Sequence, residues 1–242
     1  MSQWSKLAPA MSMVSSTVAV SLALSSPLQA ASFTIDNITG TWFNLQGTSV
    51  FNGVGTDQVR WGDPATLSGQ SGLNFQTTSS LGLISSGSNF VLGELTHLNF
   101  PVWGGTAASG VDLLLSMAID GVDYDFNYTF TIDETPNVAG LCPDFQISTT
   151  PCDDKIDFTS PFSTTTFVKN GFQYTLELLG FSRTIDGFAP VSSFITEEYQ
   201  ASSAFLVARV TKDPNSIPEP NSLLGMLLLA LASAGIKRRG FH

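Results

Sequence analysis

The segment that decides the fold is VDLLLSMAIDGVDYDFNYTFTI, residues 111–132. Every second residue from Tyr124 to Ile132 is apolar or aromatic, which places these side chains on one face of a β-strand. Asp120 and Gly121 separate this strand from the apolar run 111–119, and both residue types accept the positive φ angles of a tight turn. The segment therefore predicts an antiparallel hairpin.

A second hairpin is predicted around Asn170 and Gly171, between residues 165–168 and the alternating run 172–178. Further strands are predicted at residues 33–38, 40–46, 58–61, 73–77, 89–95, 156–158 and 204–211. No long stretch between these strands has a helical period. Short strands separated by glycine, serine and proline predict an all-β domain, an antiparallel β-sandwich of jelly-roll type.

The N-terminal residues 1–30 have the layout of a secretory signal peptide. An early cation, Lys6, precedes a run of apolar and small residues at 11–24, and Pro27 and small residues near Ala30 follow it. The run is too short to span a bilayer as a stable helix, which needs about 20 apolar residues. We therefore expect export through the Sec translocon and cleavage near Ala30. A retained N-terminal anchor is the alternative.

The C-terminal end combines three features in order. The triplet Pro218, Glu219 and Pro220 precedes an uncharged segment, 221–236, in which a short transmembrane helix is predicted at about 222–236. As a helix the uncharged segment is about 24 Å long, somewhat less than the ~30 Å hydrocarbon core. The cluster that closes it should stay cytoplasmic and consists of Lys237, Arg238 and Arg239.

This tail, residues 218–242, resembles the PEP-CTERM sorting signal of Gram-negative bacteria and cyanobacteria. The resemblance implies that an exosortase-type membrane protease cuts near the triplet. The protein would be membrane-tethered before processing and would then reach the cell surface or the extracellular matrix. An ordinary membrane anchor is the alternative. Residues 31–211 form the predicted extracellular domain, and residues 212–217 form a linker.

Charge and cysteine content limit the classes of partner and ligand that the exported region can bind. Residues 31–217 contain 6 basic and 19 acidic residues, and such a surface repels phosphate backbones, so no nucleic-acid partner is expected. Cys142 and Cys152 are predicted to form a disulfide, because a close cysteine pair outside the cytoplasm is usually oxidised. A zinc site at this pair lacks ligands, since His97 is the one histidine of the region.

A second resemblance rests on the segment FVLGELTHLNFPV, residues 90–102, with Thr96, His97 and Asn99 as its motif. It is similar to the signature of bacterial surface proteins of the THxN family, or choice-of-anchor K domain. Supporting strings are WGDP at 61–64, TPN at 135–137, GFQYTL at 171–176 and GF at 180–181. The resemblance implies a surface location and brings no activity with it.

Three kinds of residue are candidates for ligand binding. In a strand, His97 and Asn99 share one face, where they can bind a sugar hydroxyl or an ion, or simply form hydrogen bonds across a strand end. Trp61 and Trp103 lie beside glycines and are candidates for stacking on a glycan. Calcium is the candidate ion for two groups of acidic residues. The first is Asp120, Asp123 and Asp125, whose spacing does not match a calcium-binding loop, and the second is Asp153, Asp154 and Asp157.

The sequence predicts no catalytic activity. No nucleophile elbow or nucleotide-binding loop occurs, and the least implausible pair of glycosidase carboxylates is Glu94 and Glu177. We therefore expect a non-catalytic surface or matrix protein, without a cofactor, retained in extracellular polysaccharide. The alternative is a lectin-like carbohydrate-binding module, assisted by calcium.

Overall fold

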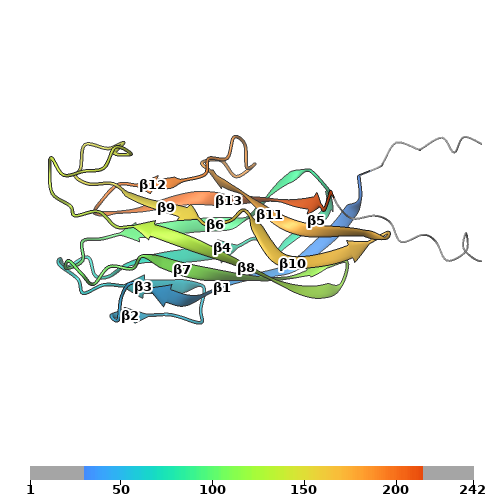
Figure 1. The fold of residues 1–242 in the computed structure, drawn as a ribbon, viewed down its shortest axis with the longest axis horizontal. Helices are drawn as coiled ribbons and strands as arrows, with labels where there is room; N and C mark the ends of the chain where they lie inside the picture. The colour runs from blue at the N-terminus through green and yellow to red at the C-terminus, as the bar shows by residue number, and fades with distance from the viewer. Residues whose placement is uncertain (1–29, 215–242) are drawn as a thin grey trace, which may run out of the picture.

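The computed structural model describes residues 30–214, and these residues form β-strands and loops without a helix (Figure 1). No helix among them is long and apolar enough to cross a membrane. The predicted signal peptide, apart from Ala30, lies outside the described residues. So do the sorting triplet, the predicted helix at 222–236 and the basic cluster.

The strands form two antiparallel sheets. The first has six strands, which in spatial order are β12 (Phe194–Thr196), β9 (Asp154–Phe158), β8 (Val122–Asp133), β7 (Gly110–Ile119), β1 (Ser32–Gln46) and β5 (Ser80–Ser85). The second has seven, which in spatial order are β10 (Phe162–Lys169), β11 (Phe172–Ser182), β13 (Gln200–Lys212), β6 (Asn89–Asn99), β4 (Ser71–Thr77), β3 (Gln58–Trp61) and β2 (Phe51–Asn52).

Both predicted hairpins are confirmed. β7 and β8 pair in register from Gly110–Thr131 to Ile119–Val122, and Asp120 and Gly121 both have positive φ, 52° and 79°. β10 and β11 are joined in the same way by Asn170 and Gly171, with φ of 53° and 77°. Positive φ at both central residues matches the right-handed twist of the strands, which is why these residue types occur there.

Two features of the strands differ from the prediction. Residues 33–38 and 40–46 are one strand, β1, because Asn37 adopts a positive φ of 55° at an irregularity in the ladder and the strand then resumes pairing with β7. The short strands β2, β5 and β12 were not predicted, since runs of two to six residues carry little periodicity.

The two sheets share one core. Phe33 of β1 packs edge-to-face against Phe167 of β10, with ring centroids 5.5 Å apart, and Phe130 of β8 lies 6.3 Å from Phe181 of β11. The hydroxyl of Tyr128 on β8 donates a 2.8 Å hydrogen bond to a carbonyl of β11. Aromatic residues predicted on one face of residues 124–132 thus hold the sheets together.

The body is elongated, and both ends of the described chain lie at the same end of it (Figure 1). Ala30 and Lys212 line one shared pocket there. The connection between β8 and β9, drawn in yellow-green, lies at the opposite end. The candidate site is located beside this connection.

Candidate functional site

At the end of the body away from the chain termini, the side chains between the two sheets are polar instead of apolar. On β6, His97 and Asn99 follow Leu95 at alternate positions, so all three side chains point between the sheets, and none is exposed. Thr96 and Leu98 point the other way, as the alternation predicts, and Thr96 contacts Ser203 at 2.8 Å.

The first sheet supplies acidic side chains by the same alternation. Glu134 follows Ile132 at the end of β8, and Asp154 precedes Ile156 at the start of β9. Glu198 lies two residues after Thr196, the last residue of β12. Asp154 and Glu198 are buried and Glu134 is half-buried, so the acids of one sheet meet the imidazole of the other.

Each of the side chains His97, Asn99, Glu134 and Asp154 is held by a hydrogen bond to one of its polar atoms. His97 Nδ1 lies 2.7 Å from the Thr196 hydroxyl, and Asn99 Nδ2 donates to the Thr196 carbonyl at 3.1 Å. Trp61 Nε1 donates to Glu134 Oε1 at 2.6 Å, and its ring stacks near the His97 ring, with centroids 6.0 Å apart. The backbone N–H of Thr135 donates to Asp154 Oδ1 at 2.8 Å.

Other atoms of His97, Asn99 and Asp154, and both carboxyl oxygens of Glu198, have no protein partner in the part of the chain that the structure describes. Five buried side-chain atoms of the described residues make no hydrogen bond, and all belong to this cluster: His97 Nε2, Asn99 Oδ1, Asp154 Oδ2, Glu198 Oε1 and Glu198 Oε2. A buried polar atom without a partner is costly and uncommon in a native protein. The concentration of such atoms in one place is therefore the main functional signal of the structure.

Burial controls the protonation of the cluster. It raises the pKa of Asp154 to about 9, with the charge of Glu134 as the next cause, and it raises the pKa of Glu198 to about 8, again with help from Glu134. Burial also raises the pKa of Glu134, against the hydrogen bond from Trp61. The pKa of His97 falls to about 3 for the same reason, so the imidazole is neutral at physiological pH.

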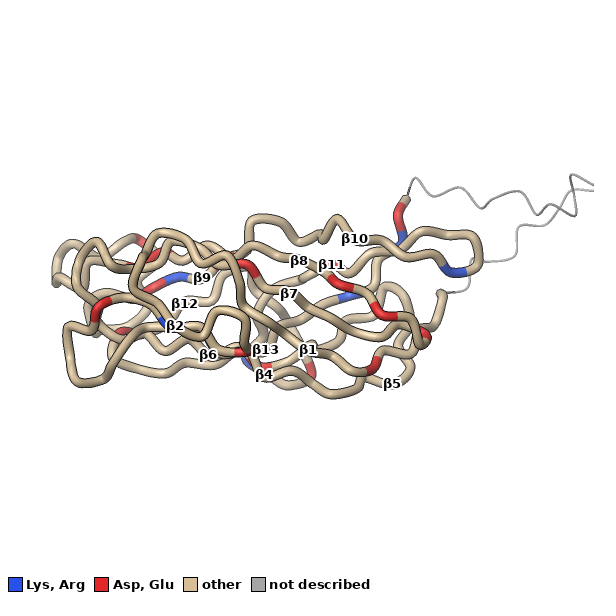
Figure 2. Tube along the Cα trace, turned by 90° about the horizontal axis from the view of Figure 1, so that it is seen from below, with Lys and Arg blue, Asp and Glu red and all other residues tan. Residues whose placement is uncertain are grey.

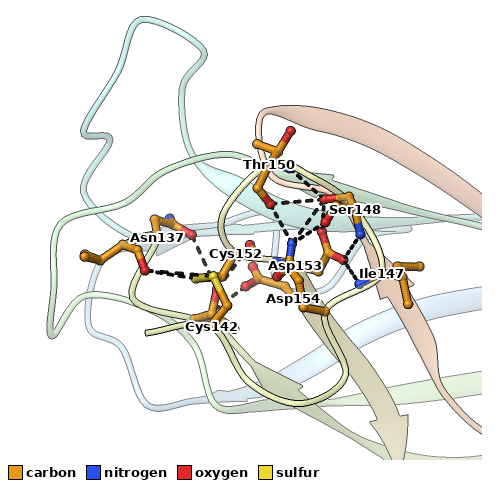
Figure 3. Close-up of a disulfide and its surroundings, with 11 residues drawn as sticks. Asn137, Cys142, Ile147, Ser148, Thr150, Cys152, Asp153 and Asp154 are labelled. Carbon is orange, nitrogen blue, oxygen red and sulfur yellow. Dashed lines mark hydrogen bonds between the residues drawn. A yellow bond between two sulfur atoms is a disulfide. The ribbon is translucent and has the colours of Figure 1, made fainter. Parts of the chain in front are cut away.

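The disulfide loop positions Asp154 (Figure 3). The predicted bond between Cys142 and Cys152 is confirmed, and the carbonyl of Cys152 accepts a hydrogen bond from Thr135, the residue whose N–H holds Asp154. Asp153 folds the loop by accepting hydrogen bonds from the N–H groups of Ile147 and Ser148 at 2.6 and 2.8 Å. Asp153 is therefore a structural residue, whereas Asp154 points one free oxygen into the cluster.

Three of the side chains can act together as ligands. His97, Glu134 and Asp154 each offer one donor atom, and these atoms lie within 4.8 Å of one another. Apart from thiolate, imidazole and carboxylate are the common protein ligands of divalent transition metals. Sequence reasoning singled out His97 and Asn99, and separately considered Asp154 for calcium, but it missed Glu134 and Glu198 and did not connect Asp154 with His97.

The residues predicted to contact a glycan differ in exposure. Trp61 is fully buried, so the expectation that it stacks on a glycan is wrong, because both of its faces are covered by the core. Trp103 is 61% exposed and stays a candidate. His97 and Asn99 have no exposed surface with which to contact a sugar directly.

The hairpin acids considered for calcium are not part of the buried cluster. Asp120 pairs with Lys169 at 2.8 Å, Asp125 accepts a hydrogen bond from Ser116, and Asp123 is exposed on the outer face of β8. Of the predicted glycosidase pair, Glu177 is occupied by Arg209 at 2.7 Å. The acidic group that the structure brings together is therefore a different one.

Comparison with known proteins adds no assignment. Neither a scan of protein-family models nor a search of curated protein sequences gives a match to this chain.

Proposed function

We propose that this chain is an exported, non-catalytic protein of the cell surface or extracellular matrix, sorted through its tail by an exosortase-type protease. The resemblance of residues 218–242 to a sorting signal supports the address, and the all-β domain with its disulfide is suited to an oxidising compartment. At the finer level we propose a jelly-roll-like β-sandwich for the domain.

The observation that carries this proposal is the position of the chain ends. Ala30 and Pro214 lie at one end of the elongated body, and the disulfide loop lies at the other (Figure 1). A domain tethered through residues after 214 would hold its disulfide loop away from the membrane. The acidic residues are spread along the body rather than gathered at the loop end, as expected of a solvated surface (Figure 2).

The sorting step is tested with the full chain in a Gram-negative host that has an exosortase-type protease. The wild type should lose its tail and reach the surface or medium, whereas the double variant Pro218→Ala/Pro220→Ala should accumulate uncleaved in the inner membrane. Pro214→Ala is the matched control and should be processed normally. Equal processing of all three forms would rule out recognition of the triplet.

A lectin-like function is the second candidate, and Trp103 is the observation that favours it. Its exposed ring lines a pocket of about 460 Å³ together with Pro101, Glu134 and Asn137. An exposed aromatic face beside polar groups is the usual platform for a sugar ring. The pocket lies beside the disulfide loop, at the end that a tethered domain would present.

A polysaccharide binding screen, run with calcium and with chelator, tests this candidate. Trp103→Ala should abolish saturable binding, while Phe188→Ala, which removes an exposed aromatic residue outside this pocket, should not. Absence of binding in both conditions would leave the structural role alone.

A further inference from the structure

We propose that the buried cluster binds one divalent transition-metal ion of the Mn²⁺ or Zn²⁺ type, with His97, Glu134 and Asp154 as ligands. Asn99 and Glu198 are buried neighbours of these three residues and are not counted as ligands. The proposal does not depend on the sorting tail or on glycan binding.

The buried atoms without hydrogen-bond partners need a partner that they can share. Asp154 Oδ2, Asn99 Oδ1 and both carboxyl oxygens of Glu198 are acceptors, and each side chain is at least 99% buried. Protonation of the carboxyl groups would supply one donor each, whereas a bound ion would be a common partner for several of these atoms at once. A single cation satisfies oxygen and imidazole lone pairs together.

Within residues 30–214, the carboxyl groups of the cluster have no basic side chain paired with them. The ion pairs of the described residues involve Asp157, Asp120 and Glu177, and none of them includes Glu134, Asp154 or Glu198. Several buried carboxyl groups therefore lie close together without a basic side chain bridged to them. A divalent cation supplies the missing positive charge, as is usual where acids converge in a protein interior.

The geometry suits an ion. Donor atoms at 2.0–2.2 Å from one ion lie at most about 4.4 Å apart. The observed limit of 4.8 Å among the atoms of His97, Glu134 and Asp154 thus requires only small side-chain movements. Glu134 also lines the pocket beside Trp103, so this pocket borders one of the three proposed ligands.

The surroundings orient each ligand. In the tautomer in which His97 Nδ1 donates to the Thr196 hydroxyl, the lone pair of the neutral ring is on Nε2, the unpartnered atom. Trp61 holds Glu134 by Oε1, and the Thr135 N–H holds Asp154 by Oδ1, so one oxygen of Asp154 stays available. Such outer partners are typical of metal sites, where they fix the tautomer and the ligand position.

The donor set selects the class of ion. Calcium and magnesium prefer oxygen ligands alone, whereas an imidazole nitrogen suits zinc and related transition metals. No thiolate is available, because both cysteines are in the disulfide. One imidazole with two carboxylates therefore fits Mn²⁺ or Zn²⁺ better than Ca²⁺.

Metal titration of the full chain tests the proposal. The chain is produced with its export signal so that the disulfide forms, is stripped with chelator, and is titrated calorimetrically with Mn²⁺, Zn²⁺ and Ca²⁺. We expect one Mn²⁺ or Zn²⁺ ion per chain, bound at least about 10-fold more tightly than Ca²⁺, and a rise in the melting temperature. Tighter binding of Ca²⁺ than of both other ions would overturn the assignment, and so would no saturable binding.

Isosteric variants locate the site. Glu134→Gln and Asp154→Asn keep the acceptors for Trp61 and Thr135, so the fold is retained while the ligand charge is lost, and affinity should fall by about 100-fold. Matched controls are Asp157→Asn and Glu197→Gln, which change neighbouring acids outside the cluster and should bind normally. Unchanged binding in the two cluster variants would contradict the proposal.

A spectroscopic measurement avoids dependence on variants that fail to fold. The chain has two histidines, His97 and His242, so His242→Gln leaves His97 as the single imidazole. Electron spin-echo spectroscopy of bound Mn²⁺ should still show coupling to a directly bound nitrogen in His242→Gln. Loss of that coupling in His242→Gln would rule out His97 as a ligand.

Discussion

The indole N–H of Trp61, at the end of β3, donates a 2.6 Å hydrogen bond to Glu134, which follows β8 in the opposite sheet. The same indole stacks beside the ring of His97. One buried tryptophan therefore positions two of the three proposed ligands from different sheets. In the proposed site Trp61 orients His97 and Glu134, and this is the use of the hydrogen bond that its buried indole donates.

Replacing Trp61 by Phe should separate its packing in the core from its role in orienting Glu134. The variant keeps an aromatic ring but leaves Glu134 without its donor, so we expect a loss of about 1–3 kcal/mol in the free energy of unfolding and about 10–100-fold weaker Mn²⁺ binding. Calorimetric titration and urea denaturation measure the two effects.

Trp42→Phe is the matched control. Trp42 is also fully buried and donates from Nε1 to the carbonyl of Asp57 at 3.0 Å, but it lies outside the cluster. Its replacement should lower stability and leave the metal affinity unchanged. If both variants changed the affinity equally, the effect of Trp61 would be one of general stability.

Thr196 should act on the cluster only through His97 and Asn99. Thr196→Val is similar in volume but removes the hydroxyl 2.7 Å from His97 Nδ1, so the ring loses the contact that fixes its tautomer. We expect destabilisation by about 1–3 kcal/mol and about 10-fold weaker metal binding. Thr196→Ser restores the hydroxyl and should recover the affinity; failure of this rescue would argue against a role in orientation.

Much of the fold could be predicted from the sequence, because its two hairpins carry strong local signals. Asp120-Gly121 and Asn170-Gly171 specify turns, and the alternation that follows each turn specifies which face is buried. The order of the strands within the sheets could not be predicted, since it depends on contacts between residues far apart in the chain.

The candidate site was predictable only in part. His97 and Asn99 stood out as polar residues on a strand, but their burial depends on the opposite sheet. A usable signal was present, because Glu134, Asp154 and Glu198 each lie two residues from a core position and thus continue a buried face. Single polar residues at strand ends are common, however, and only the fold brings these together.

The disulfide should stabilise both the domain and the cluster. Removing it by Cys142→Ser/Cys152→Ser should cost about 2–3 kcal/mol, as expected for a short closed loop. Metal affinity should also fall, since the backbone of Cys152 helps to hold Thr135, which holds Asp154. Wild type treated with a reductant is the control and should match the variant; a stability unchanged by either treatment would show that the loop is held by its other contacts.

The stability of the chelated protein should fall as the pH rises from 6.5 to 8. In this window the pKa values of Asp154, about 9, and Glu198, about 8, keep protons on the folded state that the unfolded state has already lost. Stability falls with pH wherever the folded state binds more protons, by about 1.4 kcal/mol per pH unit for each such group. His97, whose folded pKa is lowered, opposes this trend only near pH 6.5, where its unfolded state is still partly protonated; at the upper end of the window it is neutral in both states.

Urea denaturation at a series of pH values checks this expectation. The double variant Asp154→Asn/Glu198→Gln, which has no such protons to lose, should give a much flatter profile in chelator. Saturating Mn²⁺ should also remove the fall in the wild type, because a bound cation stabilises the ionised carboxylates that the chelated interior disfavours. A flat profile for the chelated wild type would mean that these carboxyl groups reach solvent and titrate normally, which would remove the charge argument for a buried cation site.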